Sequence, residues 1–256
     1  MARTTDRLTT SSEGFYSRRG FMRLLALGAL SAAMLPLTGC MFGGIGRDML
    51  ALRLLSEKYD RKFNIVMKTY YYNTSSIPKV NCCAENEDDL VFRLEFDVHE
   101  EKIVRDTYVG RKLGRQVENI ISECLEEQGI KSVSHSVVKT DYLGDKQENE
   151  YNPDIALNDF INKYNDLKIF TTIIITDQVD DPRNSPQFAE VMTLVYESLS
   201  YPISRIEVFV VDSSELELCG EYFITLPVFY SVSTIPGVKF IDSFLYRVTE
   251  SGIEVD

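Results

Sequence analysis

The chain has 256 residues, with 27 basic and 39 acidic side chains and a net charge of −12. Nucleic acid phosphates repel so acidic a chain, so the composition excludes a nucleic-acid-binding protein. The length suffices for one large domain or two small ones with an ample core.

The first forty residues have the pattern of a targeting segment and not of a folded domain. A polar, disordered leader ends in basic residues, and an uncharged stretch follows over residues 24–37. Fourteen residues rise about 21 Å as a helix, which is short of the roughly 30 Å hydrocarbon core of a bilayer. We therefore expect a cleaved signal helix, with an uncleaved N-terminal anchor as the alternative.

Two motifs in this segment resemble known export signals. The first is Ser17-Arg18-Arg19-Gly20-Phe21-Met22. It is similar to the twin-arginine motif, Ser-Arg-Arg-x-Phe-Leu, with methionine in the last place. The resemblance implies that Arg18, Arg19 and Phe21 are recognised by the export machinery and that the domain folds before it crosses the membrane.

The second motif is Leu37-Thr38-Gly39-Cys40, at the end of the uncharged stretch. It resembles the lipobox of bacterial lipoproteins. The resemblance implies cleavage before Cys40 and a covalent diacylglycerol on its sulfur. The membrane and the lipoprotein-processing machinery are then partners, and the location is the outer face of the cell membrane. Two acyl chains hold a protein firmly on a bilayer.

Removal of the signal segment makes the chain more acidic. Residues 1–39 hold five basic and two acidic side chains, so 22 basic and 37 acidic ones remain, a net charge of −15 over 217 residues. We interpret this charge as a solvated surface, which anionic headgroups repel. Residues 40–46 are predicted to be the lipidated cysteine and a short glycine-rich tether.

The remaining sequence predicts an α+β fold with mixed sheets, as two lobes of similar size or as one continuous sheet. Residues 47–142 form the N-terminal α+β lobe, residues 143–152 a polar boundary and residues 153–256 the C-terminal α/β lobe. The elements expected in the first lobe are a helix opened near Asp48, strands at 63–72 and 90–98, a helix at 106–128 ended by Gly129, and a strand at 130–142.

The second lobe alternates helices and strands. Its expected elements are helices at 153–164 and 186–199, strands at 169–176 and 203–212, and two later strands at 222–230 and 237–248. The strand at 169–176 is apolar on both faces, which predicts covering helices. Ser185 followed by Pro186 is typical of a helix start. A strand, helix and strand in this order predict a parallel pair.

Three short segments resemble small uncharacterised extracytoplasmic lipoproteins of Gram-positive bacteria, which often carry Lys-Tyr-Gly-x-x-Phe and a later Asp-x-Tyr. These segments are residues 55–63, 89–96 and 105–109. Asp60 stands where that pattern has glycine. The resemblance implies no activity.

Common catalytic motifs are absent after the signal segment. His-Glu-x-x-His, Gly-x-Ser-x-Gly, Ser-x-x-Lys and the phosphate-binding glycine loops do not occur. His99 and His135, the two histidines, lie in different predicted elements and are interpreted as structural. We expect no enzyme of these classes.

Four cysteines remain besides Cys40, and they permit three pairings. Cys82 and Cys83 are adjacent, and Cys124 and Cys219 lie far along the chain. The sequence is compatible with two alternatives: one structural disulfide, or free buried thiols. A zinc site lacks the usual Cys-x-x-Cys spacing.

Acidic residues follow the two central strands of the second lobe: Asp177, Asp180 and Asp181 after the first, and Asp212 after the second. Ligand sites form outside the carboxyl ends of parallel strands, and carboxylates bind calcium. A cation site is one hypothesis, and solvated turn residues are the other.

We expect a membrane-anchored binding or interaction module of the cell envelope with an unknown protein or ligand, and no cofactor. An envelope enzyme or cation-dependent protein that uses the edge near Asp177 and Asp212 is the alternative.

Overall fold

The computed structural model describes residues 43–69, 77–139, 152–164, 167–199, 205–227, 235–249 and 252–255. The chain divides after Phe42, and residues 43–256 form a compact unit of their own. The predicted signal residues and Cys40 lie outside the described residues. None of the described helices is both long and apolar enough to cross a membrane.

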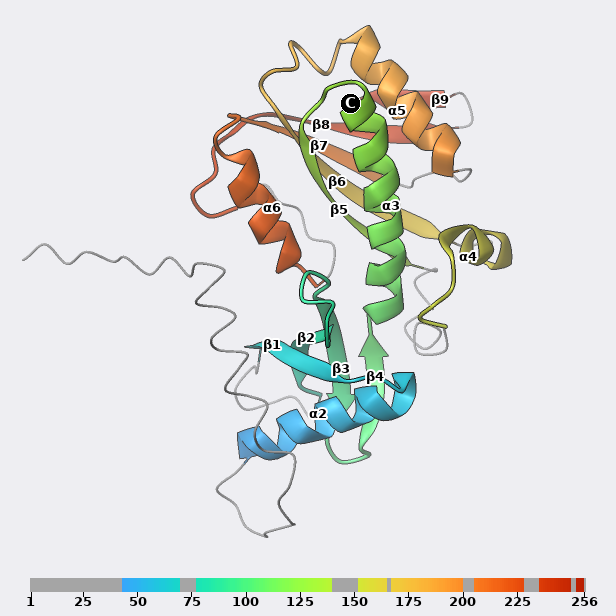
Figure 1. Cartoon of the computed structure of the whole chain (residues 1–256), viewed down its shortest axis with the longest axis vertical. Coiled ribbons are helices and arrows are strands. Elements are labelled where there is room, and N and C mark those ends of the chain that lie inside the picture. The colour runs from blue at the N-terminus through green and yellow to red at the C-terminus, as the bar shows by residue number, and fades with distance from the viewer. Residues whose placement is uncertain are drawn as a thin grey trace, which may run out of the picture. The chain divides into compact units, whose positions relative to one another are not determined.

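The fold is α+β, as the sequence predicted (Figure 1). The first sheet has the strand order β1-β2-β3-β4 and is antiparallel, and the second has the order β5-β6-β7-β8-β9. The described helices are α2 (Gly43–Tyr59), α3 (Tyr108–Glu127), α4 (Leu157–Lys163), α5 (Pro186–Leu199) and α6 (Leu216–Ile224). The strands are β1 (Phe63–Thr69), β2 (Lys79–Ala84), β3 (Phe92–Asp97), β4 (Lys102–Asp106), β5 (Ser132–Lys139), β6 (Lys168–Thr176), β7 (Arg205–Val211), β8 (Phe240–Thr249) and β9 (Gly252–Val255).

The first sheet packs against α2, which lies beside it in Figure 1. In β3, Phe92, Leu94 and Phe96 are fully buried and the residues between them are half-buried, so the strand predicted at 90–98 buries one face. Helix α2 begins at Gly43, inside the segment that the sequence predicted to be a tether. The chain between Cys40 and the fold is therefore shorter than we expected.

The second sheet is covered on both faces. Ile173 and Ile175 of β6 pack in the main core with α3 and α5, whereas Ile174 packs with Cys219 and Phe223 of α6. Strands β6 and β7 are parallel, as predicted. Strand β5, which we placed in the first lobe, pairs with β6 and belongs to the second sheet. The two sheets share one core, and α3 connects them.

Helix α3 lies unusually close to β5. A Cβ atom on Gly114 would lie 2.0 Å from the carbonyl oxygen of Ser136, and one on Gly110 would lie 2.6 Å from that of Val138. No residue other than glycine fits there without moving the helix. Gly129, with a φ of +72°, ends α3 as predicted.

Candidate functional site

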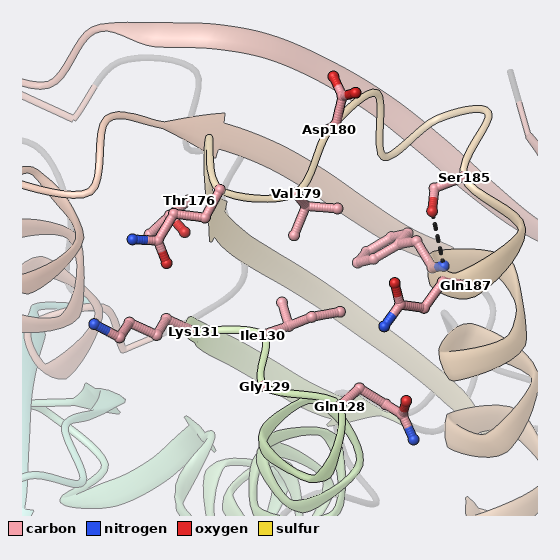
Figure 2. Close-up of a pocket in the computed structure, with 11 residues that line it drawn as sticks. Gln128, Gly129, Ile130, Lys131, Thr176, Val179, Asp180, Ser185 and Gln187 are labelled. Carbon is pink, nitrogen blue, oxygen red and sulfur yellow. Dashed lines mark hydrogen bonds between the residues drawn. The ribbon is translucent and has the colours of Figure 1, made fainter.

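A hollow of about 430 Å³ lies at the carboxyl end of β6, where the sequence placed a ligand site (Figure 2). The turn before β5, the loop after β6 and the first turn of α5 surround it. Its lining consists of Gln128, Gly129, Ile130, Lys131, Thr176, Gln178, Val179, Asp180, Ser185, Gln187 and Phe188.

The middle of this hollow is apolar and its rim is polar. Figure 2 shows the side chains of Ile130 and Val179 facing each other across it, while those of Lys131 and Asp180 point away. The Ser185 hydroxyl accepts a hydrogen bond from the Phe188 N–H at 3.3 Å and so caps α5.

The four aspartates near this edge do not form a cation site. No three His, Cys, Asp or Glu side chains of the described residues are grouped so that they could hold a metal ion. All four carboxylates are exposed: Asp177, Asp180, Asp181 and Asp212. Of the two hypotheses, the structure therefore supports solvated turn residues and not a calcium site at these four aspartates.

Local turns explain why these carboxylates stay apart. Both oxygens of Asp181 accept from the Asn184 side-chain amide, at 3.2 and 3.0 Å. Asp212 accepts from the Ser214 hydroxyl at 2.5 Å and from its N–H at 2.8 Å. These two bonds from Ser214, the hydroxyl first, lower the pKa of Asp212. Each acid thus stabilises its own turn.

The four cysteines of the described fold are free thiols, which agrees with the second of the two alternatives and not with a structural disulfide. Cys82, Cys83 and Cys219 are buried, and Cys124 is half-buried. Burial raises the pKa of Cys83 to about 12 and that of Cys219 to about 11. Thiols with so high a pKa are poor nucleophiles, and they act here as small core residues.

A second hollow, of about 240 Å³, runs along the outer edge of β5 between α3 and α6. We call it the β5 groove. Strand β5 is the first strand of its sheet, so no strand of the described residues pairs with this edge. The groove is lined by Arg111, Arg115, Glu118, Asn119, Ser122, Ser132, Val133, Ser134, His135, Gly220, Phe223 and Ile224.

A buried ion pair of α3, Arg111 with Glu118, binds the outward main-chain groups of β5 at one end of this edge. Arg111, which is 2% exposed, donates from Nη1 to Glu118 Oε1 at 2.9 Å and to the carbonyl oxygen of Ser136. The Ser136 N–H donates to the same Glu118 oxygen at 2.7 Å. The two charges therefore satisfy both outward main-chain groups of Ser136 and protect the sheet edge there.

Further along this edge, the main-chain groups of β5 lie beyond the reach of this ion pair. Main-chain groups of residues two apart on a strand point to the same side, so those of Ser134 and Ser132 face outward like those of Ser136. Both serines line the β5 groove and are half-buried. Within the described residues, no group pairs with the outward N–H or C=O of Ser134. This edge offers a donor and an acceptor to another extended chain.

His135 lies on the face of β5 that packs toward α6, next to Val133. Its Nε2 is 3.0 Å from the carbonyl oxygen of Leu226, so Nε2 carries the hydrogen and donates. Burial, and then the charges of Arg111 and Arg115, hold its pKa well below 6.5. His135 is therefore neutral at pH 7 and acts as a structural residue.

Residues from two of the segments discussed for their resemblance, 55–63 and 105–109, meet in one cluster at the end of α2. The Tyr59 hydroxyl donates to Asp106 Oδ1 at 2.7 Å, and Lys58 Nζ lies 2.6 Å from Oδ2. Asp106 is 1% exposed and also accepts from the Tyr108 N–H at 3.2 Å. Asp60 has a φ of +51°, a conformation that favours glycine. This cluster joins α2 to the start of α3 and has a structural role.

Comparison with known proteins identifies the fold and no activity. No protein-family profile and no curated protein matches the sequence. The structure is similar to the crystal structure of a DUF5037 family protein from Ruminococcus gnavus ATCC 29149, with a TM-score of 0.55 and 13% sequence identity. The match covers 81% of this chain and 94% of that chain. At this identity the likeness is one of fold alone.

Proposed function

We propose that this chain is a lipoprotein of the cell envelope, held on the outer face of the cell membrane by diacylglycerol on Cys40. The observation that carries the proposal is the sequence 37–40, Leu-Thr-Gly-Cys, at the end of an uncharged stretch that follows Arg18 and Arg19. The arrangement of a basic region, an apolar region and a lipobox is typical of exported lipoproteins.

The folded part, in this proposal, is a binding module and not an enzyme. The β5 groove supports this function because its open edge offers unpaired main-chain groups between two helices. An extended segment of an envelope protein fits such an edge, since its own main chain supplies the matching groups.

Replacement of Cys40 tests the anchor. In bacteria fed labelled palmitate, Cys40→Ala should abolish the label, leave the uncleaved precursor and release no processed chain. Cys124→Ala is the matched control, since Cys124 is a half-buried free thiol and should be labelled like the unchanged protein. Label and cleavage that survive in Cys40→Ala would show that the proposal is wrong.

A further inference from the structure

We infer that α2 is the element that faces the membrane, with Met49 among the upper acyl chains and Arg47 against the lipid phosphates. The inference rests on the proposed lipidation of Cys40 and adds the surface of the fold that the bilayer contacts. Three observations carry it: the length of chain before α2, the exposure of its first turns, and their charge.

The chain between the anchor and α2 is very short. Two residues, Met41 and Phe42, separate Cys40 from Gly43, where α2 begins. The three residue-to-residue steps from Cys40 to Gly43 span about 11 Å at most, even when fully extended. Six helical residues then rise about 9 Å to Met49. The first turns of α2 are therefore held beside the bilayer, and their exposed side chains decide how they meet it.

One exposed side chain of these turns is large and apolar. Met49 is 59% exposed, and no large apolar side chain of the described residues is more exposed. Gly46 has open space around it, with no atom within 4 Å of a Cβ placed there. The core-facing side of α2, by contrast, holds Ala51 and Leu55, which are fully buried. A side chain of this kind next to a lipid anchor suits the membrane interface.

The charge at this end of α2 differs from that of the whole chain. Arg47 is exposed, whereas Asp48, the single acid between Cys40 and Arg53, is half-buried. The exposed acid at the other end of the helix, Glu57, is paired with Arg53, whose Nη1 lies 3.3 Å from Glu57 Oε1. Although the exported chain is strongly acidic, the part nearest the anchor presents a positive charge to anionic headgroups.

The absence of tryptophan from the sequence permits a direct test. The lipidated Met49→Trp protein, made from the full chain, is placed in vesicles of phosphatidylcholine and phosphatidylglycerol with brominated acyl chains. The introduced tryptophan should lose about half of its fluorescence, because bromine quenches only at close approach. Ile241→Trp is the matched control, since Ile241 is 57% exposed on β8, away from α2 in Figure 1, and should be quenched little.

A second variant tests the charge. Arg47→Glu in the Met49→Trp background should lower the quenching in vesicles with phosphatidylglycerol and leave it unchanged in phosphatidylcholine alone. Lipidated Met49→Trp protein that is no more quenched than Ile241→Trp overturns the inference while the anchor stands. A mass spectrum without lipid on Cys40 instead overturns the proposed function, and the inference with it.

Discussion

At the scale of single residues, the close approach of α3 to β5 depends on the missing side chain of Gly114. Helix α3 approaches β5 so closely there that a methyl group would overlap the carbonyl of Ser136. The same contact lets Arg111 and Glu118 reach the edge of β5. A glycine in the middle of a helix usually weakens it, and here the loss is offset by the approach that it permits.

This contact predicts opposite effects for two glycines in helices. Gly114→Ala should lower the free energy of unfolding by about 2 kcal/mol or more, because the overlap with main-chain atoms forces α3 away from β5. Gly46→Ala, where a methyl group meets no atom within 4 Å, should raise it by about 0.5–1 kcal/mol. Urea unfolding of both variants measures the difference, and equal effects would contradict the packing described.

The buried His135 predicts a dependence of stability on pH. Its pKa in the fold lies well below the 6.5 of an exposed histidine, so the unfolded chain binds a proton that the folded chain does not. The stabilisation is therefore present above pH 6.5. It is lost as the pH falls below 6.5 toward the folded pKa, by up to about 1.4 kcal/mol per pH unit.

His135→Gln is the variant that isolates this effect, since its amide can still donate to the Leu226 carbonyl. Unfolding in urea between pH 5 and 7 should show a slope for the unchanged protein and a flatter curve for the variant. If the two curves have the same slope in this range, His135 is not the group responsible.

At the scale of elements, the groove along β5 predicts a contact made through main-chain atoms. Ser134→Pro removes an outward N–H and should block pairing with a partner strand, while an edge strand tolerates proline at such a position. Ser134→Ala leaves the main-chain N–H in place and should leave binding of the partner strand unchanged.

Photo-crosslinking in the cells that make the protein measures this contact. A crosslinking residue replaces Asn119, which is exposed on the wall of the groove. A crosslinked partner should appear with Ser134→Ala and disappear with Ser134→Pro. A crosslinker at the exposed Glu190 of α5 serves as the control. A partner that persists in the proline variant would rule out strand pairing at this edge.

The elements also show what the sequence could predict. Strands β3 and β6 were identified because one alternates cleanly and the other is an apolar run. Helix α3 was identified together with its end at Gly129. The short strands β2 and β4 were missed because their mixed polar and apolar residues resemble loops. Helix α6 was partly misread as a strand, since a run of aromatic and branched residues suits both.

The candidate site was predicted in part. The carboxyl edge of β6 was the right place for a hollow because parallel strands end together there. The cation site failed because spacing does not reveal that Asp181 and Asp212 are satisfied by neighbours within their own turns. The β5 groove left no signal in the sequence, since its edge is formed by main-chain atoms and by residues of three distant elements.

At the scale of the whole molecule, the arginine pair predicts the export route. Replacing both Arg18 and Arg19 by lysine keeps the charge but removes the guanidinium groups, so a twin-arginine signal should stop working. The processed chain should vanish from the membrane fraction. Lysine at both Arg3 and Arg7 is the matched control and should leave export unchanged. Normal export of the first variant would point to a different route.

The mass of the N-terminal peptide of the membrane-bound protein tests the central claim most directly. We expect a chain that begins at Cys40, with the first 39 residues gone and a diacylglycerol group on the cysteine. A peptide that retains residues before Cys40, or one that begins there without lipid, would contradict it.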